Sequence, residues 1–131
     1  MSTSKLFAPQ ARRWWKVLLW MLVGVTLTMA LIPAPPKALS TGWDKSDHLG
    51  AFAALAVVGR LAWGRDLKVL VLLSVGLVGL GGLIEVLQLF VPQRQADWHD
   101  VVADALGVAL GLCLGAILSW LRPRLTAAAK D

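Results

Sequence analysis

Four long apolar runs follow one another along the chain, separated by short polar or proline-containing segments. They predict helices over 14–32, 48–63 and 67–91, and a fourth that begins at Asp97 or Asp100 and ends at Leu121. A helix of about 20 apolar residues is long enough to cross a bilayer. The second run is short for this and carries an arginine, whose long side chain can reach the membrane surface. We therefore predict an all-α fold, a four-transmembrane-helix bundle.

Prolines and polar residues indicate the helix ends. Prolines lack an amide donor and stop a helix, and short polar side chains cap one. The first helix should end at the prolines within 33–36, and the second should begin at a cap formed by Ser46 or Asp47 and end at the turn 64–66. The third should end at Pro92 and the fourth at the segment 122–124.

Composition supports a membrane protein. Hydrophobic residues make up 57% of the 131 residues and charged residues only 16%, against roughly a quarter in an ordinary soluble domain. The chain is basic, but its lysines and arginines are dispersed, so we expect no nucleic-acid partner. A single cysteine excludes a disulfide framework within the chain.

The basic residues predict the orientation. Ten of the thirteen fall at one end of the bundle: Lys5, Arg12, Arg13, Lys16, Arg60, Arg65, Lys68, Arg122, Arg124 and Lys130. The positive-inside rule places this end, and with it both termini, in the cytoplasm. We therefore expect a multi-pass protein of the cell (inner) membrane, with a cytoplasmic segment over 1–13, a membrane domain over 14–121 and a cytoplasmic tail over 122–131. The alternative interpretation of the first run is a cleaved signal peptide, but the run is long for a signal-peptide core and lacks a clean small-x-small cleavage site.

The acidic residues fall at the opposite end. Six of the eight acids belong there: Asp44, Asp47, Glu85, Asp97, Asp100 and Asp104. Residues spaced three or four apart share a helix face, so Glu85 and Gln88 form one polar face and Asp97, Asp100 and Asp104 another. An ionised acid within the membrane costs several kcal/mol unless it is paired. We expect these faces to point into the bundle.

Few cations are available to balance these acids. Lys45, Arg94 and a protonated His48 cannot neutralise five neighbouring carboxylates, so either some acids hold protons or a divalent cation is bound. The candidate catalytic or metal-ligating residues are His48, Glu85 and Asp100. Arg94 is expected to pair with Asp97 or Asp100, as a structural clamp or as a fork for a phosphate group.

Glycines follow the acids on the fourth helix. Gly107, Gly111 and Gly115 continue roughly the face of Asp100 and Asp104. Small residues four apart let another helix approach closely, so this stripe predicts tight packing.

In its order of polar motifs the chain resembles the VanZ-like family of small membrane proteins. The motifs are Asp44-Lys45 with His48, then Glu85-x-x-Gln88, then Arg94-x-x-Asp97-x-x-Asp100, and the resemblance covers roughly residues 10–122. The family usually has an asparagine where this chain has Asp104. The namesake is associated with low-level resistance to teicoplanin, a lipid-tailed glycopeptide antibiotic, so the resemblance implies a cell-envelope role.

Three classes of function fit these residues. The first is the binding or remodelling of an outer-leaflet lipid headgroup or amphiphile, with membrane lipids, a lipid-linked cell-envelope intermediate or an amphiphilic antibiotic as partner. The second is a membrane-embedded, metal-assisted hydrolase or transferase on a lipid-linked substrate. The third is a structural accessory protein. The predicted binding residues are Asp44, Lys45, His48, Glu85, Gln88, Arg94, Asp97, Asp100 and Asp104.

Overall fold

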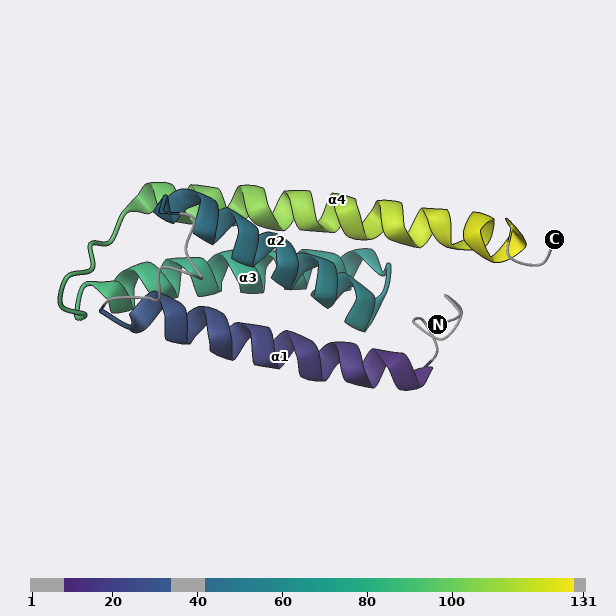
Figure 1. Cartoon of the computed structure of the whole chain (residues 1–131), viewed down its shortest axis with the longest axis horizontal. Helices are drawn as coiled ribbons and strands as arrows, with labels where there is room; N and C mark the ends of the chain where they lie inside the picture. Colours follow the sequence, from purple (N-terminus) through teal and green to yellow (C-terminus); the bar gives the residue numbers. More distant parts are fainter. Residues whose placement is uncertain (1–8, 34–41, 129–131) are drawn as a thin grey trace.

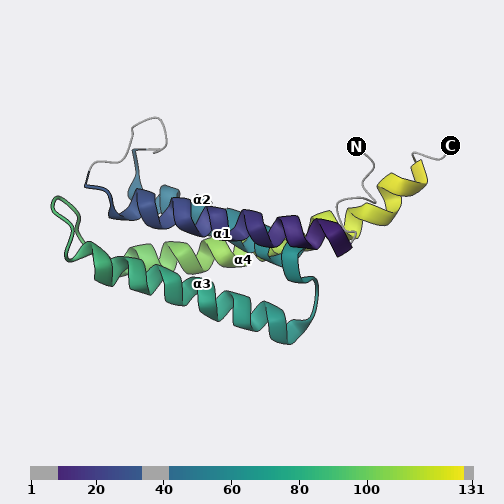
Figure 2. The same cartoon turned by 90° about the horizontal axis from the view of Figure 1, so that it is seen from below.

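The fold is a bundle of four helices. The computed structural model describes residues 9–33 and 42–128, and these contain no strand. The helices are α1 (Pro9–Leu31), α2 (Asp44–Trp63), α3 (Leu67–Gln88) and α4 (Trp98–Ala128). Neighbours in sequence run in opposite directions, so α1 and α3 end where α2 and α4 begin (Figure 1), and Figure 2 shows the same arrangement after a turn of 90°. The predicted all-α fold is confirmed.

Three of the helices are long and apolar enough to cross a membrane. They supply the segments Ala11–Leu31, Leu67–Gln88 and Trp98–Leu121. Helix α2 has 20 residues but includes charged groups at both ends, Asp44, Lys45 and Asp47 at its start and Arg60 near its end. The chain is therefore a membrane protein in which α2 is the most polar helix.

Helix α2 begins earlier than the apolar pattern predicts. It starts at Asp44 instead of His48, and neither Ser46 nor Asp47 caps it. Asp44 and Asp47 instead lie in its first turn, where carboxylates interact favourably with the helix dipole. The helix ends at Trp63, and the next residue, Gly64, has a φ of 93° in the region that favours glycine.

The boundaries of α3 and α4 also differ in part. Asp66 caps α3 by accepting a hydrogen bond from Val69 N at 3.1 Å, and the helix ends at Gln88, three residues before the predicted end. The sequence predicts Asp97 or Asp100 as the cap of α4. The cap is Asp97, whose Oδ1 accepts a hydrogen bond from His99 N at 3.0 Å.

Helix α4 does not end at Leu121. It continues through Pro123 to Ala128, so the predicted end is wrong. A proline inside a helix removes one backbone hydrogen bond and can kink the helix without ending it. The predicted segments 1–13 and 122–131 lie partly outside the described residues, as do the prolines after residue 33, and these domain boundaries stay predictions.

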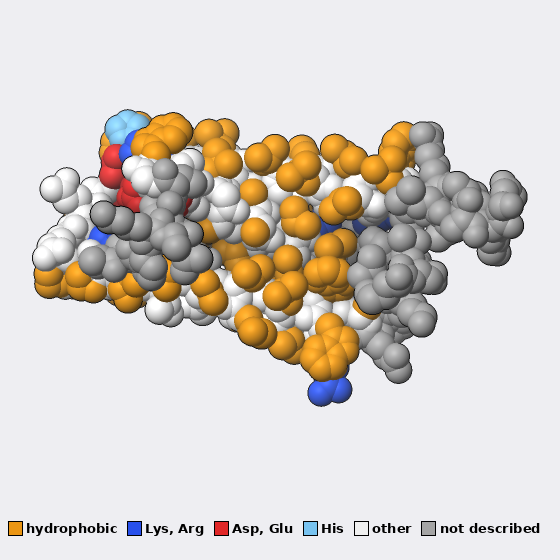
Figure 3. Space-filling model, in the orientation of Figure 1, with side chains coloured by type: hydrophobic (Ala, Val, Ile, Leu, Met, Phe, Trp, Pro, Cys, Tyr) orange, Lys and Arg blue, Asp and Glu red, His pale blue; other side chains and the backbone are white. Residues whose placement is uncertain are grey.

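Helix α2 occupies the middle of the bundle and contacts each of the other three helices. Its Phe52, Leu55 and Ala56 are fully buried and pack with Ile84 of α3 and Val108 of α4. Large apolar side chains of the other helices face outward, and hydrophobic side chains cover the middle of the face in Figure 3. An apolar exterior of this kind suits a lipid environment.

The glycine stripe packs α4 against α2, as predicted. A Cβ added to Gly107 would run into the carbonyl oxygen of Leu49, and one added to Gly111 would run into that of Ala53. Only glycine allows the two backbones to approach this closely.

Candidate functional site

A polar cluster lies at the end of the bundle where α2 and α4 begin. On the face shown in Figure 3, the acidic side chains gather at this end. His48, Glu85, Gln88, Asp100 and Asp104 are buried, and all nine predicted binding residues contribute to this end of the bundle. Their functional roles stay predictions. His99 is exposed at the same end, where its ring nitrogen Nδ1 contacts Asp97.

His48 lies at the centre of this cluster. Its Nδ1 is 2.9 Å from Asp104 Oδ1, and its Nε2 is 3.9 Å from Glu85 Oε1. An ionised Asp104 can only accept a hydrogen bond, which places the ring proton on Nδ1. The lone pair of Nε2 then points away from Asp104 and toward the side of Glu85.

Lys45 joins the start of α2 to the start of α4. Its Nζ lies 2.7 Å from Asp97 Oδ2 and 3.2 Å from Asp100 Oδ1. The Lys45 ammonium, together with the backbone and ring N–H groups of His99, holds the pKa of Asp97 well below its usual range. Asp97 N in turn donates to Glu85 Oε2 at 2.7 Å, so α3 is tied to the same point.

Arg94 does not pair with Asp97 or Asp100, and this prediction is wrong. Its Nε donates to Ile32 O at 3.1 Å and its Nη2 to Met29 O at 2.7 Å. The nearest carboxylate oxygen, on Asp44, is 3.9 Å from Nη1. The last turn of α1 contains no basic residue, and its free carbonyl groups need donors from elsewhere.

Gln88 supplies a further donor to α1. Its Nε2 donates to Ala30 O at 3.1 Å. Together with Arg94, it attaches the end of α1 to α3 and to the segment that follows α3. Sequence reasoning placed both residues in the site but missed this contact, which depends on the fold.

Three buried oxygen atoms lack a donor within the described part of the chain. They are Glu85 Oε1, Gln88 Oε1 and Asp104 Oδ2. All three can accept a hydrogen bond or coordinate a cation. A buried acceptor without a partner costs about 1–3 kcal/mol, and more if it is charged. The cluster is therefore short of positive charge or of protons.

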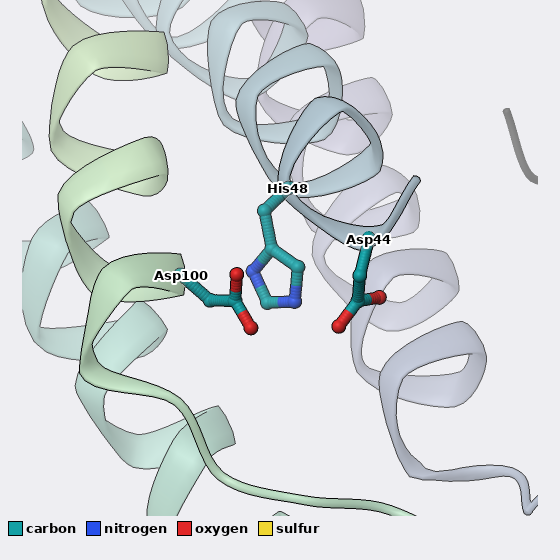
Figure 4. A group of neighbouring side chains, drawn as sticks. All are labelled: Asp44, His48 and Asp100. Carbon is teal, nitrogen blue, oxygen red and sulfur yellow. The ribbon is translucent and has the colours of Figure 1, made fainter. Parts of the chain in front are cut away.

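Asp44, His48 and Asp100 form a group that could hold a metal ion. One ligand atom from each lies within 4.8 Å of the other two. In Figure 4 the imidazole of His48 lies between the carboxylates, with Asp44 on the same helix and Asp100 on α4. Of the predicted metal candidates His48, Glu85 and Asp100, this group contains His48 and Asp100 but not Glu85. It includes Asp44 instead, which one turn of helix brings to the face of His48.

An apolar cavity of about 600 Å³ opens beside the cluster. One wall comes from α1 and another from α2, whose small Gly50, Ala51 and Ala54 leave room. The polar residues at its mouth are Asp44, Ser46, Asp47, His48, Gln88 and Arg94. Sequence reasoning did not predict this cavity, although small residues on one face of α2 are the signal that could have indicated it.

The site can therefore hold a polar or charged group at its mouth and an apolar group between α1 and α2. These features define a membrane protein built as a helical bundle, with a buried acid–histidine cluster at one end and an apolar cavity beside it. The chain belongs to the VanZ/LLP1 family, whose model matches residues 5–119, and the predicted resemblance is confirmed. Comparisons with curated proteins and with solved structures gave no match.

Proposed function

We propose that this VanZ-like protein binds an amphiphile of the outer leaflet, with its headgroup at the polar cluster and its hydrocarbon chain in the cavity between α1 and α2. The ligand classes are a membrane lipid, a lipid-linked cell-envelope intermediate and a lipid-tailed antibiotic of the kind associated with the family's namesake. All three combine a polar head with an apolar chain.

The cavity is the observation that carries this proposal. Its volume of about 600 Å³ is within the range of small-molecule sites, roughly 300–1,000 Å³. A water molecule occupies about 30 Å³ of liquid, so the cavity has room for on the order of 20 groups of that size. That is the scale of one acyl chain. Leu22, Val25 and Phe52 line its apolar part, and Asp44 and Arg94 lie at its mouth.

The proposal includes an orientation. All four helices span the cell (inner) membrane, both termini are cytoplasmic, and the polar cluster faces the extracytoplasmic side. The basic residues support this, because Arg65 and Lys68 lie at the end opposite the cluster. The position of α2 among the other three helices supports a span despite its charged ends, because those helices cover its buried residues, His48 among them, and keep them from lipid.

Cysteine labelling tests this orientation. In a Cys113→Ser background, Gln95→Cys lies next to the cluster and Arg65→Cys lies in the turn between α2 and α3, and both positions are exposed. A membrane-impermeant maleimide should label Gln95→Cys in intact cells and Arg65→Cys only after permeabilisation. The reverse pattern would place the cluster in the cytoplasm, and labelling of both from outside would show that α3, the helix between the two positions, does not cross the membrane.

Filling the cavity tests ligand binding. A Cβ at Gly50 meets open space, and Gly50 lines the cavity, so Gly50→Phe should occupy it without a backbone clash. Gly79→Phe is the matched control, because Gly79 also meets open space but does not line the cavity. Both proteins are purified from nanodiscs of phosphatidylethanolamine and phosphatidylglycerol, and native mass spectrometry measures the lipid that each retains.

The expected result is loss of most retained lipid from Gly50→Phe and unchanged retention in Gly79→Phe. Thermal unfolding in the same detergent checks that both variants are folded. Equal retention by both folded variants would overturn the proposal, because a chain seated between α1 and α2 must be displaced by the phenylalanine ring.

Hydrolysis or transfer on a lipid-linked substrate is the second candidate function, favoured by one observation. His48 has a carboxylate on Nδ1 and a second carboxylate near Nε2, an arrangement suited to general acid–base chemistry. Mass spectra of the nanodisc lipids before and after incubation distinguish the two candidates, because an enzyme releases a cleaved headgroup or chain and a binding protein does not.

A further inference from the structure

The two ring nitrogens of His48 have different surroundings. Nδ1 is hydrogen-bonded to Asp104, whereas Nε2 has Glu85 Oε1 as a neighbour at 3.9 Å. A hydrogen bond between nitrogen and oxygen requires about 2.7–3.2 Å, so this second pair is too far apart for one. An ion between the two atoms would contact both.

The spacing is close to that of a metal site. Zinc binds nitrogen and oxygen ligands at about 2.0–2.2 Å, so neighbouring ligand atoms in a tetrahedral site are roughly 3.4 Å apart. The pair formed by Nε2 and Glu85 Oε1 is within about half an ångström of that value. Asp44 and Asp100 supply ligand atoms to the same histidine within 4.8 Å.

Glu85 provides an independent indication of a ligand. It is buried, with 6% of its surface exposed, and its Oε1 has no hydrogen-bond partner within the described part of the chain. Its other oxygen accepts from Asp97 N, so the carboxylate is held in place with Oε1 facing His48. A buried acceptor that is fixed and unpartnered requires a proton donor or a cation.

Asp104 occupies the position of an orienting group. A histidine that binds a metal through one ring nitrogen usually donates its other N–H to a carboxylate, which fixes the tautomer and the ring orientation. Asp104 Oδ1 accepts from Nδ1 at 2.9 Å, and Asp104 is fully buried on the packed face of α4. This leaves Nε2 free to coordinate.

We propose that Asp44, His48 and Asp100 bind a divalent transition-metal ion, with Glu85 as a further ligand and Asp104 as the positioning residue for His48. The inference rests on the polar cluster of the proposed function but not on lipid binding. An imidazole with carboxylates suits zinc or manganese, whereas magnesium and calcium prefer oxygen ligands alone.

The ion would change which headgroup the mouth accepts. Without it, the carboxylates of Asp44 and Asp100 repel a phosphate, and Lys45 is already paired with Asp97 and Asp100. A bound cation at Asp44 offers a phosphate oxygen a direct partner. Phosphate-bearing amphiphiles are therefore the ligand class that this site would take.

Metal titration of the purified full-length protein tests the site. The protein is treated with EDTA in detergent without phospholipid, the chelator is removed, and zinc, manganese and magnesium chlorides are added in separate calorimetric titrations. We expect one zinc or manganese ion per chain and much weaker binding of magnesium. X-ray absorption of the zinc form should show one imidazole among oxygen ligands.

Variants identify the ligands. Asp44→Asn and His48→Gln should each weaken binding at least 100-fold, and Asp104→Asn should weaken it about 10- to 100-fold, as expected for an orienting group. Asp47→Asn is the matched control, because it lies in the same first turn but outside the ligand group, and its affinity should be unchanged. Asp44 is half exposed, so its variant should fold even if the His48 variant does not.

Two outcomes would overturn the proposal. One is the absence of stoichiometric zinc or manganese binding by the parent protein, which would leave protons as the balance for Glu85 and Asp104. The other is equal affinity in Asp44→Asn, Asp47→Asn and the parent. Neither affects the cavity experiment with Gly50→Phe, so failure of the metal site and failure of lipid binding are distinguishable.

Discussion

The two faces of α2 differ in how closely the next helix approaches. Toward α4, Gly107 and Gly111 lie against the carbonyl oxygens of Leu49 and Ala53, leaving no room for a single methyl group. Toward α1, Gly50 meets open space and borders a cavity of about 600 Å³. Glycine thus allows close contact on one face and leaves space on the other.

The two faces of α2 therefore have different roles: the close face, toward α4, positions the polar side chains, and the open face, toward α1, leaves room for a ligand. The close face holds His48 of α2 against Asp104 of α4 and Lys45 of α2 against Asp97 and Asp100. A hydrogen bond of this kind tolerates displacements of only a few tenths of an ångström. The open face leaves an apolar space next to those fixed groups. A binding site in a membrane protein needs both, a rigid polar part and an adjoining space for the apolar part of its ligand.

Disrupting the close contact between α2 and α4 should have the largest effect on stability. In Gly111→Ala, the new methyl group meets the carbonyl oxygen of Ala53, and backbone cannot move aside as a flexible side chain can. Because the clash is with backbone, we expect overpacking to lower the free energy of unfolding by about 3 kcal/mol, the upper end of its usual range. Thermal unfolding in detergent, followed by circular dichroism, measures this loss.

Gly79→Ala is the control for this experiment. Its Cβ meets open space, so its stability should be unchanged or raised by up to about 1 kcal/mol through the better helix propensity of alanine. If Gly111→Ala and Gly79→Ala unfold at the same temperature, the close contact between α2 and α4 does not determine stability.

Loosening the open face should have a smaller effect on stability. Arg94→Ala removes the two donors to Met29 O and Ile32 O that attach the end of α1. Hydrogen bonds to charged groups contribute about 1.5–3 kcal/mol, and water can replace part of this at the end of a helix, so we expect a loss of about 2 kcal/mol. Because α1 forms one wall of the cavity, retained lipid should also fall.

Hydrogen exchange locates this effect. Exchange should accelerate in a peptide covering residues 27–33 and stay unchanged in α4. Arg65→Ala removes an exposed arginine at the opposite end of the bundle and should alter neither region. Unchanged exchange at the end of α1 in Arg94→Ala would show that Gln88 alone is sufficient to hold it.

The bundle itself could be predicted from sequence because lipid restricts the choices. A chain in a bilayer must satisfy its backbone groups within helices, so the lengths of the apolar runs indicate the helices directly. The gathering of Asp44, Glu85 and Asp100 at one end followed from their distances along successive helices, since each helix crosses the bundle once. Their common depth depends on helix length and direction alone, and not on side-chain contacts.

The partner of Arg94 could not be predicted in the same way. Sequence spacing suggested Asp97 and Asp100, yet Lys45 pairs with both, and Arg94 binds carbonyl groups of α1. That choice depends on where the free carbonyls at the end of α1 lie in space. The cavity was missed for a related reason, because an absence of packing between two helices leaves only weak signals such as Gly50.

The smallest effect on stability is expected from Lys45, which joins the start of α2 to the start of α4 at the margin of the close face. In Lys45→Met, Asp97 and Asp100 lose their shared ammonium, but Asp97 keeps its contacts with His99, and the packing at Gly107 and Gly111 is untouched. We expect a small loss of stability in dilute buffer that shrinks further in 1 M salt, where charges are screened beyond about 3 Å. Chemical unfolding with urea, which adds no ions, measures both conditions, and Lys68→Met provides a control at the opposite end. A loss as large as that of Gly111→Ala would mean that the ion pairs of Lys45 hold α2 against α4 as strongly as the glycine contacts do, and that close packing is not the main determinant of this interface.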